Sequence, residues 1–190
     1  EEIHCELVFP GNIYIPFASL SPEFSSHSVT CNSPSKAFNI AGLQIANIIV
    51  PDNDMRTRID RAININEVCD VNPFGVEALI AAYNEGEEWL SQLLAYLKGN
   101  DNFMWDFCRQ NLPQFPLTRL EGTYLEWMDC KTIGLASAEL EKRLIDEAGL
   151  WLNAGTMYGA EGEGFMRWNI ACPRSRLTEG LERFRQYISS

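Results

Sequence analysis

The sequence predicts an α/β protein, in which strand-like and helix-like segments alternate along the chain. In the first fifty residues, and again after residue 120, apolar residues recur at every second position in short runs, as is typical of strands. Elsewhere they recur at spacings of three and four, as is typical of helices. Hydrophobic residues make up 46% and charged residues 22% of the 190 residues, so the chain can form one good domain or two small ones.

Residues 1–50 are predicted to form short strands joined by turns. In the first strand, apolar residues alternate with polar ones until a Pro-Gly pair ends the run: Ile3, Cys5, Leu7 and Phe9. Residues 28–31 predict a second strand, followed by a loop of serine and proline at 33–35. The segment 46–51 is apolar and β-branched and stops at a proline, which predicts a buried strand.

Asn72 and Pro73 predict the start of a helix, because asparagine is a good N-cap and proline is tolerated in the first turn. Helical spacing then continues to Gly99, and Gly86 is a predicted break between two helices. Residues 102–108 are expected to start another helix.

Residues 120–129 predict a strand, with either Leu125 and Trp127 or Tyr124 and Met128 facing a core. Four aromatic residues are interpreted as core residues without a catalytic role: Trp89, Tyr124, Trp127 and Tyr158.

The last fifty residues contain two predicted helices and two strand-like pieces. Ser137 to Ala148 predict a helix that Gly149 closes. Strand-like pieces at 151–159 and 164–172 follow. The closing helix has an apolar stripe: Leu177, Leu181, Phe184 and Ile188.

The composition excludes several classes of function. With 26 acidic and 15 basic residues the formal charge is −11, which repels nucleic acid and anionic lipid, so we expect neither as a partner. The longest apolar run, residues 40–50, is interrupted by Gln44 and Asn47 and is shorter than the roughly 18 residues that a membrane-spanning helix needs.

The cysteines and histidines predict no metal site. There is no CxxC pair and there are only 2 histidines, and a disulfide framework is not expected in a chain of this length. We therefore expect reduced thiols in a cytoplasmic protein, at all six cysteines: Cys5, Cys31, Cys69, Cys108, Cys130 and Cys172.

Lys36 stands directly after the Ser/Pro loop, and the string S-x-S-K-x-F-N-x-A-G-L from Ser33 to Leu43 resembles the lysine loop of fold-type I enzymes that depend on pyridoxal phosphate (PLP). Such enzymes need a lysine amine that binds the cofactor aldehyde, and hydroxyl donors that hold its phosphate. The resemblance implies that Lys36 carries PLP and that Ser33 and Ser35 help to hold the phosphate. Many family members have an arginine eight residues after the lysine, where this chain has Gln44. The competing interpretation of Lys36 is a solvated turn lysine.

The opening EEIH is similar to the D-E-I-H string of the same superfamily. The resemblance places Glu1 where an aspartate normally pairs with the pyridine nitrogen of the cofactor, and places His4 beside the ring hydroxyl. A strand histidine satisfied by its neighbours is the alternative for His4.

Near the end of the chain, Arg167 and Asn169 form an R-x-N string that resembles the superfamily motif for the substrate's α-carboxylate. A guanidinium can donate two parallel hydrogen bonds to a carboxylate. A structural ion pair is the alternative for Arg167. Arg174 and Arg176 are competing candidates, interpreted as charges at the start of the last helix or on its solvated face.

Three stretches, at 2–11, 72–100 and 120–130, look like the cystathionine β-lyase branch of the aminotransferase superfamily. The resemblance implies the C-terminal half of such an enzyme: residues 1–105 as the end of the PLP-binding large-domain sheet with its lysine loop and helices, and residues 106–190 as a small α+β domain. It implies a homodimer that acts on amino acids in the intact enzyme, and a chain that is catalytically incomplete by itself.

The implied reaction is β-elimination at a C–S bond, which gives pyruvate, ammonia and a thiol. An aminotransferase would use the same lysine and arginine, and a fragment with only a structural or interaction role is the alternative from another class. These three possibilities stay open at the level of sequence.

Overall fold

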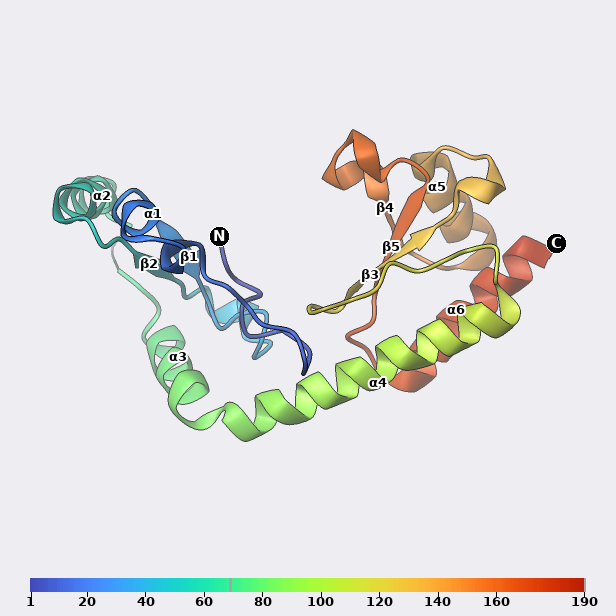
Figure 1. Ribbon diagram of the computed structural model, residues 1–190, viewed down its shortest axis with the longest axis horizontal. Helices are drawn as coiled ribbons and strands as arrows, with labels where there is room; N and C mark the ends of the chain where they lie inside the picture. The colour runs from blue at the N-terminus through green and yellow to red at the C-terminus, as the bar shows by residue number, and fades with distance from the viewer. Residues whose placement is uncertain (69, 190) are drawn as a thin grey trace. The chain divides into compact units, whose positions relative to one another are not determined.

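The computed structural model describes residues 1–68 and 70–189 (Figure 1). The fold is mixed α/β, which confirms the predicted class, and its described strands form two small antiparallel sheets. The chain divides into two compact units, residues 1–94 and 95–190, within helix α4 (Glu87–Asn111). The boundary predicted between residues 105 and 106 falls in the same helix.

The first unit begins with turns and two short strands. Its elements before the long helices are the 3-10 helix η1 (Phe17–Ser19), α1 (Pro22–Ser26), β1 (Thr30–Asn32), the 3-10 helix η2 (Ala41–Leu43) and β2 (Asn47–Ile49). β1 and β2 pair antiparallel, with Thr30 opposite Ile49. Both strands were predicted close to these positions.

The strand predicted over residues 3–9 is wrong. The chain turns there, because Cys5 N–H donates to Glu2 O at 3.0 Å and Leu7 N–H donates to His4 O at 2.9 Å. Leu7 and Phe9 are nevertheless buried, at 0% and 1% exposure. The alternation of apolar and polar residues therefore predicted correctly that Leu7 and Phe9 are buried. The backbone N–H and C=O groups are paired in local turns and not in a strand ladder.

The burial predicted for residues 46–51 is wrong for most of the strand. Ile48 and Ile49 are each 48% exposed, and Val50 at 5% is buried. A sheet of two strands leaves most of its surface uncovered, so an apolar β-branched run does not by itself imply a central strand.

Helix α2 (Asn53–Ile65) was not predicted. Asp52 caps it, with its carboxylate accepting the N–H of Met55 at 2.7 Å. None of its residues is fully buried, but Met55, Ile59 and Ile63 stand four positions apart and are half-buried, so the sequence carries a short apolar stripe that the prediction missed.

The predicted start and break of the next helices are confirmed. α3 (Pro73–Glu85) is capped by Asn72, whose side chain accepts the N–H of Phe74 at 3.0 Å. Gly86 separates α3 from α4, and a Cβ there would overlap the Phe38 ring. The ring of Phe38 stacks on Trp89 with centroids 5.6 Å apart, so the bend between the helices receives an aromatic side chain from the lysine loop.

The predicted end of α4 at Gly99 and the separate helix at 102–108 are wrong, because one helix continues to Asn111. The buried stripe runs through Leu97, Asn100, Asp101, Met104 and Cys108. Asn100 and Asp101 are polar, so the stripe does not read as apolar in the sequence. The Asn100 amide donates to the carbonyl oxygens of Ile170 at 2.7 Å and Cys172 at 3.0 Å, which satisfies it in the core.

The second unit packs helices against a three-stranded sheet. The strand order is β3 (Leu125–Asp129), β5 (Phe165–Asn169), β4 (Asn153–Ala154), with β5 in the centre. Met128 and Met166 are 0% exposed, so the register that puts Met128 in the core is the correct one of the two predicted.

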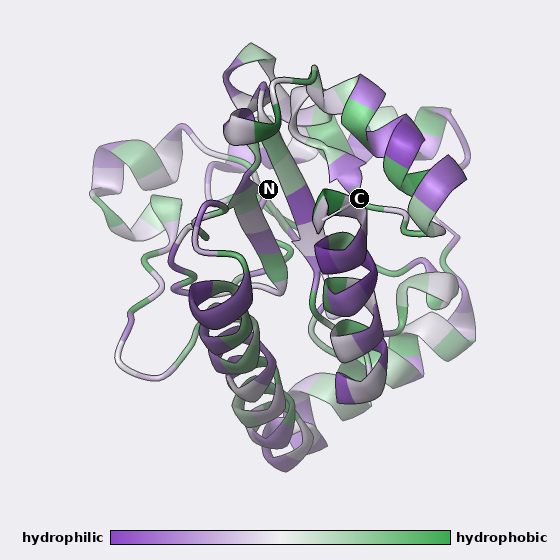
Figure 2. Cartoon of the chain, turned by 90° about the vertical axis from the view of Figure 1, so that its right-hand side faces the viewer, coloured by the Kyte–Doolittle hydropathy of each residue, from purple (hydrophilic) through white to green (hydrophobic). Residues whose placement is uncertain are grey.

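Helices α5 (Ser137–Ala148) and α6 (Arg174–Ser189) complete the unit. Both predicted helices are confirmed, and α5 ends at Gly149 as expected. Hydrophilic and hydrophobic residues alternate along α6 in Figure 2, and three of its stripe residues are buried: Leu177, Leu181 and Phe184. The strand-like piece at 151–159 is a strand only at Asn153–Ala154; the 3-10 helices η4 (Gly155–Tyr158) and η5 (Ala160–Gly162) follow.

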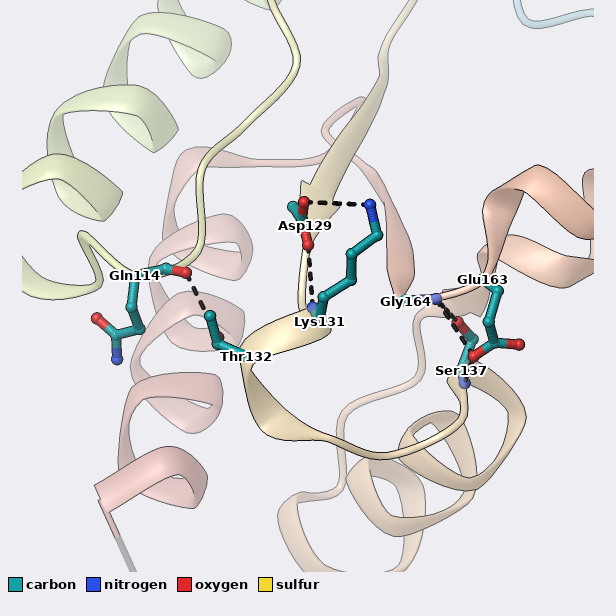
Figure 3. A network of polar contacts seen from close by, with 7 residues as sticks. All are labelled: Gln114, Asp129, Lys131, Thr132, Ser137, Glu163 and Gly164. Atoms are coloured by element: carbon teal, nitrogen blue, oxygen red, sulfur yellow. Dashed lines mark hydrogen bonds and ion pairs between the residues drawn. The ribbon is translucent and has the colours of Figure 1, made fainter.

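A polar network ties the start of α5 to the turn before β5 (Figure 3). Glu163 accepts the N–H groups of Ser137 at 2.7 Å and Gly164 at 3.2 Å. The Ser137 hydroxyl, on a residue 1% exposed, accepts the Gly164 N–H at 2.7 Å. The residue directly before β5 is thus fixed by two acceptors, which sets where the central strand begins.

Five of the six cysteines are free thiols: Cys5, Cys31, Cys108, Cys130 and Cys172. The prediction for Cys69 lies outside the described residues. Among the helices in the described ranges, none is long and apolar enough to cross a lipid bilayer.

A pair of buried carboxyl groups links α4 to β3. Glu126 is 0% exposed and Asp101 is 1% exposed. Lys98 Nζ lies 2.6 Å from Oδ2 of Asp101. Burial first, and then the neighbouring Asp101, raise the pKa of Glu126 to about 9, which Lys98 opposes. Glu126 therefore keeps its proton in the folded protein at neutral pH.

We expect Glu126→Gln to flatten the pH dependence of stability. Between about pH 4.5 and pH 9 the folded state holds a proton that the unfolded state has lost, so the parent loses up to about 1.4 kcal/mol of stability per pH unit as the pH rises. The uncharged amide removes this slope. Urea midpoints measured from about pH 5 to pH 9 test it, with exposed Glu121→Gln as the control. Parallel curves for the Glu126 variant and its parent would contradict the assignment.

Candidate active site

Lys36 lies on a closed loop between β1 and β2. The Ser33 hydroxyl donates to the carbonyl oxygen of Ile45 at 2.5 Å, which joins the two ends of the loop. Ala37 is 0% exposed, whereas Lys36 itself is exposed. The loop is thus anchored on both sides of an amine that points to the surface of its unit.

Helix α3 also fixes this loop. A Cβ on buried Gly75 would lie 2.9 Å from Leu43 O and 3.2 Å from the Ile45 Cβ, so only glycine allows the first turn of α3 to approach so closely. At the other end of α3, the Phe38 ring meets Tyr83 edge-on at 6.3 Å. The fold therefore holds the segment after Lys36 at two points.

The two loop serines contact each other, and their hydroxyl oxygens are 2.5 Å apart. Since Ser33 donates its single proton to Ile45 O, Ser35 donates to Ser33. Ser33 also accepts the Ser35 N–H at 3.1 Å, so its hydroxyl has no free donor or acceptor position. The residue is 3% exposed. Ser35 is the serine whose hydroxyl can rotate toward an anion.

The structure brings the opening residues beside β1. Glu2 N–H donates to Cys31 O at 2.8 Å, so Glu1 and His4 lie in the unit that carries Lys36. Glu1 is exposed and His4 is half-buried. The Tyr14 hydroxyl, and then the Phe17 N–H at 3.0 Å, hold the pKa of the Glu2 carboxyl below its usual value.

Arg167 lies on the central strand of the second unit, opposite Trp127 of β3 and Asn153 of β4. Its Nη2 donates to the Asn153 side-chain oxygen at 3.0 Å, and its Cζ lies 4.3 Å from the centre of the Tyr158 ring. No carboxylate of the described residues forms an ion pair with it. The structural ion pair that was the alternative for Arg167 is therefore not formed among the described residues.

The neighbouring candidates have local roles. The Asn169 side-chain oxygen accepts the Ala171 N–H at 2.9 Å, which closes a turn after β5. Arg174 Nε donates to Asn100 at 2.8 Å, and its Cζ lies 4.6 Å from the Phe103 ring centre, so it joins α6 to α4.

Sequence reasoning missed Asn153 and misjudged Tyr158. Tyr158 and Trp89, both interpreted as core aromatics, are 48% and 46% exposed. Cross-strand pairing sets Asn153 opposite Arg167, and that register is not legible from the sequence of either strand alone. Lys36 belongs to the first compact unit and Arg167 to the second. Within the described residues, His, Cys, Asp and Glu form no group of three or more that could hold a metal.

Comparison with known proteins gives one family. A family model described as "Aminotransferase class I and II" matches residues 1–184. The curated protein "Cystathionine beta-lyase PatB" of Bacillus subtilis (strain 168) is 41% identical over 189 residues, which cover 100% of this chain and 49% of that protein. The chain thus spans about half the length of the curated relatives it matches.

Two solved structures share the fold. Cystalysin from Treponema denticola, whose crystal structure contains pyridoxal 5'-phosphate, superimposes with a TM-score of 0.95 at 31% identity, over 99% of this chain and 48% of that one. The PLP-bound C-S lyase from Staphylococcus hominis gives a TM-score of 0.88 at 34% identity, over 100% of this chain and 49% of that one.

Proposed function

Since this chain belongs to the class I and II aminotransferase family, we propose that it is part of a PLP-dependent enzyme that cleaves a C–S bond of an amino acid. The substrate class is a cystathionine-like amino acid, and the products are pyruvate, ammonia and a thiol. The observation that carries the proposal is the lysine loop, which holds an exposed Lys36 between anchored neighbours. The similarity to a cystathionine β-lyase over the whole chain supports elimination rather than transamination.

The residues of the loop fit PLP. Lys36 forms no ion pair among the described residues, and the Ser35 hydroxyl stands one position before it. The Ser33 hydroxyl, predicted to help hold the phosphate, is occupied by Ile45 and Ser35 instead. When bound, PLP supplies an aldehyde for an amino group and a ring that accepts an electron pair. Lys36 would hold the aldehyde, and Ser35, by rotating away from Ser33, would donate to the phosphate.

In the proposed reaction the chain's own residues bind the substrate and move its proton. Arg167, with Asn169 beside it on β5, would bind the α-carboxylate. The Lys36 amine would remove the proton from the substrate's Cα. Glu1 would lie near the pyridine nitrogen and His4 near the ring hydroxyl. Loss of the Cβ–S bond then releases the thiol, and water converts the remaining fragment to pyruvate and ammonia.

Product analysis of the full-length protein tests the reaction class. With cystathionine as substrate, we expect pyruvate, ammonia and thiol in equal amounts, with no added keto acid required. An aminotransferase needs the same lysine and arginine but would form a keto acid and leave the amino group on the cofactor. That pattern, without thiol release, would show that the protein is an aminotransferase.

The proposal includes a homodimer in the cytoplasm. The family resemblance supports the dimer, and the five free thiols are compatible with a reducing compartment.

A further inference from the structure

Two side chains hold the Arg167 guanidinium while leaving most of its donors open. Asn153 takes one N–H of Nη2, at 3.0 Å. The Tyr158 ring lies under the guanidinium at 4.3 Å, and a cation–π contact uses the face of the group and none of its in-plane N–H donors. Nε is buried without an acceptor among the described residues. The edge formed by Nη1 and the remaining N–H of Nη2 is therefore the part that can receive a ligand.

The position of Tyr158 follows from a turn that folds back on itself. A Cβ on Gly155 would overlap the carbonyl oxygen of Gly162, and a Cβ on Gly162 would overlap that of Gly155, so the turn needs glycine at both places. From β3, Trp127 packs edge-on against the Tyr158 ring, with centroids 5.6 Å apart and an angle of 80°. The ring is thus held by its own turn and by the neighbouring strand.

We propose that Tyr158 and Asn153 are positioning residues, which orient Arg167 so that its Nη1–Nη2 edge receives the α-carboxylate of the substrate. This inference rests on the proposed function. An arginine side chain has many rotamers, and their loss on binding weakens affinity. The Tyr158 ring fixes the plane of the guanidinium and Asn153 fixes its Nη2 before the substrate binds. Less rotamer entropy is then lost on binding. Substrate affinity should then depend on two residues that make no contact with the carboxylate.

Tyr158 is tested in the full-length protein by Tyr158→Leu and Tyr158→Phe. Loss of the ring should raise the KM for cystathionine roughly 3- to 30-fold with little change in kcat, because a cation–π contact of this size is lost. Phenylalanine keeps the ring, so its KM should stay within about twofold of the parent. If the hydroxyl rather than the ring held Arg167, the phenylalanine variant would raise the KM as much as the leucine variant, and the role assigned to the ring would be wrong.

Asn153 is tested by Asn153→Leu, which removes the oxygen that accepts the Arg167 Nη2 N–H and keeps a side chain of similar size. The guanidinium then loses one of the two contacts that orient it. The Kd of an unreactive α-methyl amino acid, measured from the absorbance of the cofactor, should rise roughly 3- to 10-fold. The Kd of a primary amine without a carboxylate should not change. Asn102→Leu, on the exposed face of α4, makes the same exchange and should leave both values at the parent level.

Two outcomes overturn the inference in distinguishable ways. If Arg167→Ala loses affinity for the α-methyl amino acid but Tyr158→Leu and Asn153→Leu bind it like the parent, the positioning role is wrong and the proposed function stands. If the parent binds no PLP and acts on no amino acid, the proposed function fails and this inference fails with it.

Discussion

Lys36→Ala in the full-length protein should abolish both the visible absorbance of the bound cofactor and turnover. The amine is proposed to hold the PLP aldehyde and to remove the Cα proton, and loss of a general base alone costs roughly a hundred- to ten-thousandfold in rate. Both effects should appear together, because one atom has both roles. The absorbance spectrum of the purified protein and a pyruvate assay measure them.

The fold should survive this change. Lys36 is exposed, and the loop is held by Ser33, Ala37 and Phe38 instead. Lys142→Ala, at an exposed position of α5, is the matched control and should keep both band and activity. If the Lys36 variant kept its band, another lysine would carry the cofactor. Lys98 and Lys131 would be examined first, although each lies near a carboxylate, at 2.6 Å and 3.5 Å.

Arg167→Ala should raise the KM for amino acids roughly 10- to 100-fold and leave the cofactor band intact. A charge-assisted contact is worth about 1.5–3 kcal/mol, and each 1.4 kcal/mol is a factor of ten. The cofactor band should persist because the proposed link to PLP is through Lys36. Steady-state kinetics together with the absorbance spectrum check both halves of this expectation.

Two variants sharpen the test of Arg167. Arg167→Lys keeps the positive charge but cannot donate two parallel hydrogen bonds to a carboxylate. Its KM should therefore lie between those of the alanine variant and the parent. Arg109→Ala removes an arginine whose side chain is 77% exposed and should change nothing. Kinetics of Arg167→Ala equal to those of the parent would remove this residue from the site.

Much of the fold could be predicted where one physical signal dominates. The helix start at Asn72, the break at Gly86 and the end of α5 at Gly149 each depend on a local cap or turn, and all three are confirmed. The end of α4 was wrong because Asn100 and Asp101 occupy core positions. The buried Asn100 amide is hydrogen-bonded to Ile170, 70 residues away, and the buried Asp101 carboxylate to Lys98. A local sequence pattern does not reveal these partners.

The candidate site divides in the same way. Lys36 and Arg167 stand in strings that resemble family motifs, so they could be named from the sequence, and their roles stay predictions. Asn153 and Tyr158 could not, because a cross-strand register and a turn closed by two glycines bring them to Arg167. The Ser33 hydroxyl likewise donates its hydrogen to the Ile45 carbonyl oxygen, at the far end of the loop, which the sequence does not indicate.

Reducing the full-length protein with borohydride and mapping the labelled peptide by mass spectrometry identifies the lysine that carries the cofactor. Reduction fixes PLP to the amine that holds it. We expect one modified lysine, Lys36, in the peptide that also contains Ser33 and Phe38. A label on any other lysine, or none on a protein that still shows the visible band, would contradict this expectation.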